Sequence, residues 1–384
     1  MMRIVIEYML EIHKKMKLSP NDIMYVKGVY ESFYGPIERI DDYFRVRKAE
    51  RLKELPTMLF GYGDEYFEDY SMSPKDMEFK VVKMKPREFD ILLEYTSSFC
   101  NDQNPGKSLR YAVIEQNTGR YVGFIKLGSP VINMRPRNIM FGGPPNLELF
   151  NKSAIMGFVI VPVQPFGYNY LGGKLLALIC TSHFIRREIN DKYDVNMCMF
   201  ETTSLYGNLK SASQYDGLKP FMRYKGLSDS KFLLNFGDKE YEDLRKFFVE
   251  RNGGKSLVDD GASSRKLKTS NAMLGILKSN IRDYDLQMYE KFVKFIESKV
   301  DITTRKRYYI SFYGYQNVTE YMTGKNSKLV KNVNFDRFEL NSVIDWWKNK
   351  AQRRYDKLKG NGDLRIEQEI WDADKIKDEY DIIR

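Results

Sequence analysis

The residues of this chain that could perform chemistry are concentrated between Ile155 and Leu218. An apolar run, IMGFVIVP, ends at Pro162 and leads into the turn Gln-Pro-Phe-Gly-Tyr-Asn at residues 164–169, which is followed by Gly172-Gly173. The first amide groups of a helix lack acceptors within the helix and lie at the positive end of its dipole. A helix that begins after this turn would therefore bind an anion such as a phosphate.

The paired glycines have two explanations, and these residues leave both open. Glycine weakens a helix, so two of them in a first turn indicate that something approaches the backbone closely. In one explanation a ligand makes this approach, and in the other the helix packs tightly on a sheet. Asn169 is well suited to cap the helix in both cases.

A second set of residues is suited to contact with nucleic acid. Cations alternate with aromatic residues in three clusters of the C-terminal half, which is typical of phosphate contact combined with base stacking. Each cluster is equally typical of a solvated helix face. The clusters contain Arg265, Lys266 and Lys268; Arg305, Lys306 and Arg307; and Lys348, Arg353 and Arg354. We expect double-stranded DNA as the partner, with Arg135 and Arg137 steering its backbone from a long loop.

Several other kinds of site are not expected. The chain has only two histidines, His13 and His183, so neither a metal site nor a histidine-dependent triad is predicted. Its three cysteines, Cys100, Cys180 and Cys198, form no C-x-x-C pair, which indicates a reducing compartment. No P-loop, kinase motif set or nucleophile elbow occurs.

Composition sets broader bounds on the protein. With 384 residues, 42% of them hydrophobic, the chain can form two or three packed units. Its formal charge of +10 can attract polyanions. No run approaches the roughly 20 apolar residues of a membrane span, and the N-terminus lacks the continuous apolar stretch of a signal peptide. We therefore expect a cytoplasmic protein without a membrane partner; the sequence does not indicate its oligomeric state.

The pattern of apolar residues divides the chain into three regions. Residues 1–74 show helical spacing interrupted by Ser19-Pro20, which predicts a helical N-terminal extension. Residues 78–230 alternate between strand and helix patterns, which predicts the α/β core. Residues 231–384 are basic and predicted to be mainly helical, with the longest helical signal at 267–300.

The predicted core contains a strand, a helix, a hairpin and then a strand–helix–strand unit. A continuous apolar run indicates a strand buried on both faces, and a strand–helix–strand order indicates parallel pairing. The elements are a strand at 79–84, a helix from Pro86 to Phe99, a hairpin across Asn117–Gly119, an irregular segment at 130–151, a strand at 155–162, one helix with its apolar stripe from Leu171 to Ile189, and a strand at 196–203.

The turn at residues 164–169 resembles the loop Q/R-x-x-G-x-G/A of acetyltransferase-like (GNAT-like) proteins, which it matches at Gln164 and Gly167. Asn169 stands where that family has a small residue. The resemblance implies an α/β fold with a mixed sheet, whose fourth strand and following helix hold acetyl-CoA or a related acyl donor. The implied contacts are Val161, Val163, Gln164, Gly167, Tyr168, Asn169, Leu171, Gly172 and Gly173.

The chain more closely resembles DruA-type proteins of Druantia antiphage systems. The shared parts are Asn151 with Ser153, the strand 158–162, Lys192-Tyr193, Glu201-Thr202, and Ser213 with Tyr215. The hairpin end Gly123–Pro130 is similar to Mom-like phage proteins, which modify adenine in DNA and share the acetyltransferase-like fold. These resemblances cover about a third of the chain.

The resemblance implies that chemistry takes place where the strands ending at Val163 and Thr203 diverge. There Glu201 would act as a general base or orient an amine. Tyr206 and Tyr215, with Ser213 in the same motif, would donate to a leaving thiolate or stack on a displaced base. The ordinary alternatives are an exposed ion pair for Glu201 and core positions for the tyrosines.

Three functions follow as hypotheses. The first is a Mom-like enzyme that transfers a small acyl-type group to a base amine in DNA. The second is a non-catalytic DNA-binding component of a phage or antiphage defence system, with a degenerate acyltransferase fold. The third is an N-acetyltransferase that acts on protein or small-molecule amines. An open turn at Gly167 with free amide groups favours an enzyme, whereas a turn plugged by Phe166 or Tyr168 favours the second hypothesis.

Overall fold

A computed structural model describes residues 16–55, 65–98, 106–209, 212–231, 234–262 and 265–371. The helical pattern expected before residue 16 and the expected helix end at Phe99 lie outside these residues. No helix in the described chain is long and apolar enough to cross a membrane.

The chain forms two compact units, and each is built from two separate stretches. The helical unit takes its described residues from 16–47 and 234–303, and the α/β unit takes its own from 48–231 and 304–371. This division differs from the three consecutive regions expected from the sequence. The reason is that two strands on either side of the second helical stretch pair with each other, which sequence spacing does not reveal.

The helical unit contains α2 (Pro20–Tyr34), the first part of α3 (Ile40–Glu54), α11 (Asp238–Arg251), α12 (Arg265–Tyr284) and α13 (Leu286–Asp301). Ser19 caps α2 in a capping box, so the predicted boundary at Ser19-Pro20 is confirmed. The long helical signal at 267–300 is two helices, because the side chain of Asp285 accepts the amide hydrogen of Met288 and starts a new helix.

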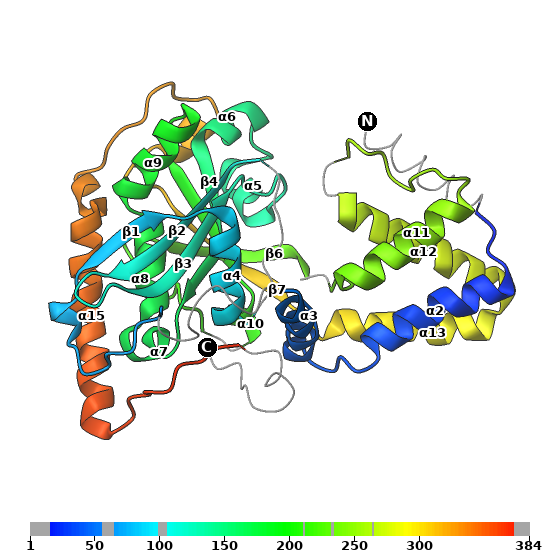
Figure 1. Ribbon diagram of the computed structural model, residues 1–384. Coiled ribbons are helices and arrows are strands. Elements are labelled where there is room, and N and C mark those ends of the chain that lie inside the picture. The colour runs from blue at the N-terminus through cyan, green and yellow to red at the C-terminus, as the bar shows by residue number, and fades with distance from the viewer. Residues whose placement is uncertain are drawn as a thin grey trace. The chain divides into compact units, whose positions relative to one another are not determined.

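The α/β unit is organised around a seven-stranded mixed sheet in the order β1-β2-β3-β4-β5-β7-β6 (Figure 1). Only β4 and β5 pair in parallel; every other neighbouring pair is antiparallel. The strands are β1 (Phe79–Lys83), β2 (Ser108–Glu115), β3 (Arg120–Gly128), β4 (Ala154–Pro162), β5 (Met199–Ser204), β6 (Arg223–Lys231) and β7 (Arg305–Ser311). The mixed α/β class and the predicted strands from β1 to β5 are confirmed.

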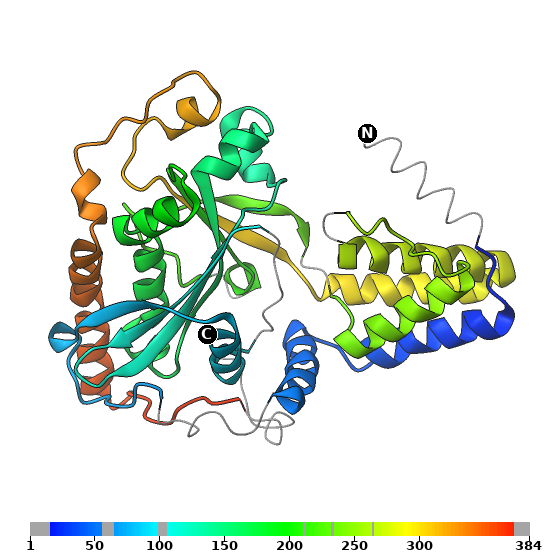
Figure 2. The same ribbon diagram turned by 45° about the horizontal axis from the view of Figure 1, so that its top comes forward.

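Helices cover both faces of the sheet, as Figure 2 shows, with α8, α9 and α15 on one side and α4 on the other. Side chains alternate between these layers. Leu109, Tyr111 and Val113 of β2 face the core shared with α8, whereas Ala112 packs with Phe89 of α4. The helices are α4 (Pro86–Thr96), α7 (Phe166–Tyr170), α8 (Gly172–Cys180), α9 (His183–Tyr193) and α15 (Leu340–Asn361).

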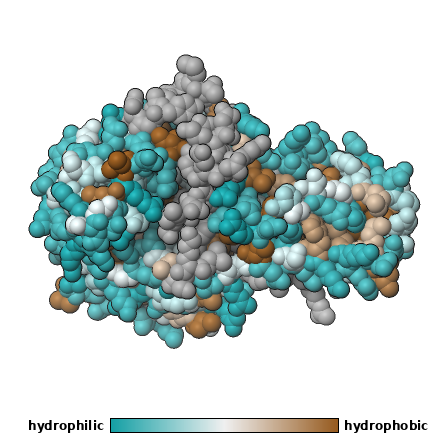
Figure 3. Space-filling view, turned by 90° about the horizontal axis from the view of Figure 1, so that it is seen from below, coloured by the Kyte–Doolittle hydropathy of each residue, from teal (hydrophilic) through white to brown (hydrophobic). Residues whose placement is uncertain are grey.

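The shorter elements of this unit are α5 (Arg135–Phe141), α6 (Leu147–Ser153), α10 (Tyr206–Leu209), α14 (Val318–Met322) and the 3-10 turns η1 (Pro74–Asp76) and η2 (Phe335–Phe338). Figure 3 shows that the described surface is mainly hydrophilic in that view, with apolar residues in small separate groups.

Three sequence predictions about these elements are wrong. The segment 130–151, expected to be irregular, contains α5 and most of α6, because Pro136 lies in the first turn of one helix and Asn146 caps the other. The single helix expected from Leu171 to Ile189 is interrupted, because Ser182 caps a new helix. The strand β7 lies in the region expected to be mainly helical, where it pairs with β5 and β6.

Candidate functional site

The turn after β4 uses its own amide groups within the chain. Gly167 donates to the Val163 carbonyl at 2.8 Å, and Asn169 donates to the Pro165 carbonyl at 2.8 Å. Tyr168 donates to the side-chain oxygen of Gln164 at 3.0 Å. The expected array of outward-facing amides is therefore not formed at these three positions. The ring of Phe166 is fully buried and fills the space inside the turn.

The glycines of the turn are explained by close packing of the chain on itself. A Cβ atom on Gly167 would lie 2.6 Å from Pro162, and one on Gly172 would lie 2.6 Å from the Phe166 ring. A Cβ atom on Gly173 would lie 2.1 Å from the side-chain oxygen of Gln214. The Pro162 and Phe166 rings would have to shift to admit these Cβ atoms, so the structure favours packing over ligand approach as the reason for Gly167 and Gly172. At Gly173 only the end of the Gln214 side chain would have to move.

Asn169 does not cap a helix, as the sequence predicted, but lies fully buried inside α7. The helix after it, α8, begins at Gly172 and has Leu171 at its N-cap position. Leu171 has a left-handed φ of 56°, and its carbonyl accepts from the indole of Trp347 at 3.2 Å. The side chain of Asn169 instead binds the backbone of Arg365: its amide nitrogen donates to the Arg365 carbonyl at 2.7 Å, and its oxygen accepts from the Arg365 amide at 3.1 Å.

These two bonds tie residues 363–371 along the outside of the turn, and we call this segment the strap. The Glu369 amide donates to the Gln164 carbonyl at 3.3 Å, and the Trp371 amide donates to the Tyr95 carbonyl at 2.8 Å. The Tyr168 ring is stacked with two guanidinium groups, that of Arg365 at 3.9 Å and that of Arg354 at 4.7 Å. The turn is thus covered by the chain's own residues, and it does not fit an acyl donor in this conformation.

The two parallel strands are paired only in the part of β4 that is far from the turn, and they diverge in the part next to it. Pairing runs from Ala154↔Met199 to Gly157↔Thr202 and then stops, although β4 continues to Pro162. The side-chain amide of Gln214 donates to the Ile160 carbonyl at 3.0 Å within the diverging part of β4. A residue from the segment after α10 therefore occupies the gap.

Asp216 is the centre of a polar cluster beside this gap. Its carboxylate accepts two hydrogen bonds of 3.1 Å from the Arg307 guanidinium and one of 2.8 Å from the Tyr309 hydroxyl. It also accepts the Ser213 amide at 2.9 Å. The Asp216 side chain remains 37% exposed, so the cluster has an open side toward solvent.

The structure brings two of the predicted catalytic residues to this cluster. Ser213 is buried, and its hydroxyl accepts the Tyr215 amide at 3.2 Å. Tyr215 is also buried and packs edge-to-face on Tyr309 with ring centroids 5.3 Å apart. Tyr206 begins α10, but its side chain is outside the described part of the structure.

Glu201 lies in a separate, fully buried network. Its carboxylate accepts from Arg137 at 2.8 and 3.1 Å and from the Tyr308 hydroxyl at 2.6 Å. Burial raises the pKa of Glu201, and the neighbouring Arg137 and Tyr308 oppose that rise. Glu201 and Arg137 are both fully buried. The Glu201 carboxylate is therefore part of an internal ion pair, and not the exposed ion pair or the general base between the strands that the sequence suggested.

Arg137, expected to steer DNA, is likewise not available to an outside partner. Its side chain is fully buried, donates to the carbonyls of Val131 and Ile132 at 2.9 and 2.6 Å, and lies 4.2 Å from the Phe150 ring. The prediction failed because the segment around it forms a helix that turns Arg137 toward β5. Arg135, two residues before, is exposed.

The first of the predicted basic clusters is partly neutralised within the helical unit. Arg265 pairs with Asp260, and Lys266 lies 2.7 Å from Asp238. Lys268 is partly buried on the same helix. Two of the three cations therefore already have counter-charges, which weakens their attraction for a phosphate.

The second basic cluster lies on a strand and not on a helix. Arg305 is exposed, whereas Arg307 is engaged by Asp216 and lies 4.6 Å from the Tyr224 ring. Burial lowers the pKa of Lys306, which means that its charged form is disfavoured in the folded protein. This cluster therefore contributes mainly to contacts within the sheet and offers little charge to an outside ligand.

The third cluster lies on α15 and keeps its charge. Lys348 donates to the Lys75 carbonyl at 3.2 Å, and Arg353 donates to the Asn349 carbonyl at 3.2 Å. Three further cations on this helix give it six in total: Lys348, Lys350, Arg353, Arg354, Lys357 and Lys359. Within the described residues none of the six is paired with a carboxylate, so α15 is the least neutralised of the predicted DNA contacts.

Sequence comparison links the α/β unit to known proteins. Residues 45–217 match the family model of Druantia protein DruA. The Druantia protein DruA of Escherichia coli (strain UMEA 4076-1) is 21% identical over 201 residues, which cover 47% of this chain and 49% of that protein. The chain thus spans about half the length of this curated relative. No solved structure matches this chain.

The matched range supports the DruA-like part of the predicted resemblance. It contains β1 to β5, the turn after β4 and the segment with Ser213 and Tyr215, and it ends one residue after Asp216. Sequence reasoning missed Asp216 and Tyr309. Asp216 directly follows Tyr215 of the predicted Ser213–Tyr215 motif, and this position could have drawn attention to it. Tyr309 follows the basic residues 305–307 and was interpreted only as part of that cluster.

Proposed function

We propose that this protein is a DNA-binding component of an antiphage defence system, in which a DruA-like α/β unit acts as a scaffold and not as an acyltransferase. The similarity to DruA supports the defence context. The observation that carries the DNA-binding part is the helix α15, whose six cations have no carboxylate partner within the described chain. Phosphate contacts by such cations supply most of the free energy of sequence-independent DNA binding.

The closed turn after β4 supports the non-catalytic part of the proposal. The amide groups of Gly167, Tyr168 and Asn169 donate within the chain, and the strap covers the turn. The strand before the turn is the fourth of the sheet and is parallel to the fifth. That arrangement agrees with an acyltransferase-like ancestry, so we describe the unit as a degenerate fold of that kind.

The test is a comparison of DNA affinity between two doubly substituted variants of equal charge. Arg353→Gln with Lys357→Gln removes two exposed cations of α15, and Lys325→Gln with Lys328→Gln removes two exposed cations elsewhere on the α/β unit. We expect the α15 variant to bind a short duplex about tenfold more weakly than wild type at low salt, and the control to bind within twofold. Equal affinities in both variants would remove α15 as the binding surface.

A second candidate, DNA base modification of the Mom-like kind, is favoured by the Asp216 cluster alone. A partly exposed carboxylate that accepts from a tyrosine hydroxyl could take a proton from a base amine. Nucleoside mass spectrometry of DNA from cells that express wild type or Asp216→Asn tests this candidate. A modified base that depends on Asp216 would replace the scaffold proposal, and unmodified DNA in both strains would support it.

A further inference from the structure

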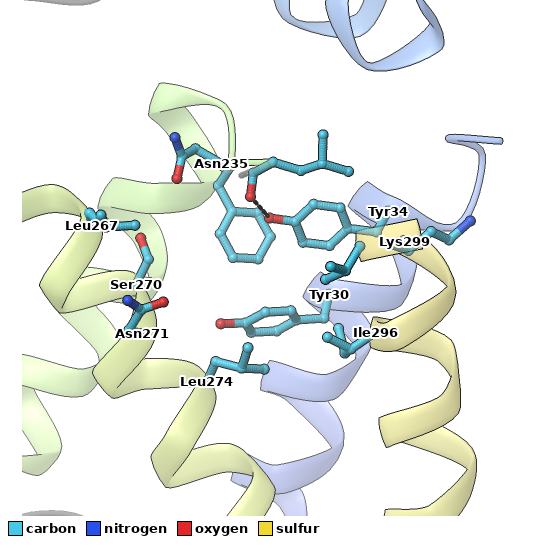
Figure 4. Close-up of a pocket in the computed structure, with 12 residues that line it drawn as sticks. Tyr30, Tyr34, Asn235, Leu267, Ser270, Asn271, Leu274, Ile296 and Lys299 are labelled. Carbon is cyan, nitrogen blue, oxygen red and sulfur yellow. Dashed lines mark hydrogen bonds between the residues drawn. The ribbon is translucent and has the colours of Figure 1, made fainter. Parts of the chain in front are cut away.

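The helical unit contains an apolar cavity that the proposed function does not use (Figure 4). Its volume is about 110 Å³. Residues from α2, α12, α13 and the short segment 234–236 line it, and all of them belong to the helical unit. An apolar cavity of roughly 150 Å³ is large enough for one benzene ring. The volume here is therefore of the order that a single small ring needs.

One wall of the cavity consists of three aromatic rings. Phe236 lies edge-on to Tyr30, with centroids 4.7 Å apart and an interplanar angle of 75°, and lies tilted against Tyr34 at 5.1 Å. Leu267, Leu274, Ile296 and Val300 form the aliphatic remainder. Aromatic rings prefer edge-to-face and offset contacts with other rings, so this wall favours an aromatic occupant over a linear alkyl chain.

The Tyr30 hydroxyl gives the cavity one hydrogen-bonding group without a partner. Tyr30 is 3% exposed, and its hydroxyl makes no hydrogen bond to any residue that the structure describes. Figure 4 shows its ring extending from α2 toward α12, with the hydroxyl directed toward Ser270, Asn271 and Leu274. Burial raises the pKa of Tyr30, so it remains a donor at neutral pH. An acceptor on a ligand can therefore receive a hydrogen bond from this hydroxyl.

Two other polar groups at the cavity already have hydrogen-bond partners within the chain. The Tyr34 hydroxyl donates to the Leu234 carbonyl at 3.0 Å. The Lys299 amine donates to the carbonyls of Gly35 and Ile37 at 3.1 and 2.8 Å. Figure 4 shows the Lys299 amine directed away from Tyr30, so a charged ligand beside the Tyr30 hydroxyl would lie next to no counter-charge, whereas a neutral ligand can accept the Tyr30 hydrogen bond.

We propose that this cavity is a binding site for a small, neutral, single-ring aromatic compound that carries one oxygen acceptor, and that the acceptor receives the Tyr30 hydroxyl. Two of its lining residues, Asn271 and Val300, are exposed. Four separate stretches of the helical unit line the cavity, so an occupant would hold them together. Binding would therefore stabilise this unit against unfolding.

The experiment compares phenol with toluene, which has the same size but no oxygen, by ligand-observed NMR and thermal unfolding of the full chain. We expect phenol to bind about tenfold more tightly than toluene and to raise the melting temperature of the helical unit. Tyr30→Phe keeps the ring and should reduce phenol affinity to that of toluene. No saturable phenol binding, or equal affinity for both compounds in wild type, would overturn the proposal.

Two variants that fill the cavity provide the control for location. Ser270→Leu and Leu274→Phe both add apolar volume from α12, and a melting curve establishes that each one folds. We expect either folded variant to lose phenol binding. Unchanged phenol binding in both would place the compound elsewhere and would also overturn the proposal.

Discussion

Asn169 and Arg365 exchange two hydrogen bonds between a side-chain amide and a backbone peptide group, although they lie 196 positions apart in the chain. An asparagine can form this pair because its amide carries both a donor and an acceptor. A small residue at position 169 could not form this pair. The acyltransferase-like loop that the turn resembles has a small residue at this position, where this chain has asparagine. The side chain of Asn169 therefore contributes to the attachment of the strap over the turn.

Replacing this asparagine should release the strap. Asn169→Ala removes both bonds and leaves the Arg365 peptide group without them, so we expect a loss of about 2 kcal/mol in unfolding free energy. Amide hydrogen exchange in residues 363–371 should become faster, because these amides lose their attachment. Asn349→Ala, on the exposed face of α15, is the control. An exchange rate in the strap equal to that of wild type would show that other contacts hold it.

The stability of the α/β unit should fall as the pH decreases below 6.5, because of one histidine. His183 is fully buried, its Nε2 lies 2.9 Å from the Phe335 carbonyl, and its Nδ1 accepts from Arg186 at 3.2 Å. Burial and the positive charge of Arg186 lower the pKa of His183 to about 4. The unfolded chain therefore binds a proton between pH 6.5 and 4 that the folded chain does not, and the stabilising contribution present above pH 6.5 is lost across that window.

Tryptophan fluorescence can follow this effect specifically, since Trp346, Trp347 and Trp371 all belong to the α/β unit. Between pH 7.5 and pH 5 we expect wild type to lose about 2 kcal/mol of unfolding free energy more than His183→Gln. Parallel pH profiles for the two proteins would show that His183 is protonated in the folded state at its ordinary pKa.

Removing Arg137 should be more damaging than removing both members of its ion pair. Arg137→Met leaves the buried carboxylate of Glu201 without its counter-charge, for which we expect a loss of about 3–5 kcal/mol. Arg137→Met combined with Glu201→Gln removes the stranded charge, so the double variant should unfold at a higher urea concentration than the single variant. The reverse order would mean that the single variant's carboxylate gains access to water.

Strands with strong local patterns could be predicted from the sequence, whereas pairing between strands that lie far apart in the chain could not. The apolar run that became β4 and the hairpin of β2 and β3 have nearby turn signals, so their identity could be read from the sequence. The strand β7 could not, because its partner β6 lies on the other side of the helical stretch 234–303. Its alternation of cations and tyrosines is typical of a solvated helix face as well as of a strand.

The structure brings some of the predicted site residues together and separates others. The motif with Ser213 and Tyr215 does lie beside the gap between β4 and β5, but Glu201 faces Arg137 inside the fold. The pattern could not show which loop residue pairs with a buried carboxylate. It also could not show that Asn169 has a partner near the end of the described chain.

We propose that α15 holds DNA through phosphate contacts, and the salt dependence of DNA binding tests this proposal most directly. Each lost phosphate contact lowers the slope of log affinity against log salt by about 0.9. Removing Arg353 and Lys357 together should therefore reduce the magnitude of the wild-type slope by about 2, whereas removing Lys325 and Lys328 should leave it unchanged. Identical slopes in wild type and both variants would contradict the account.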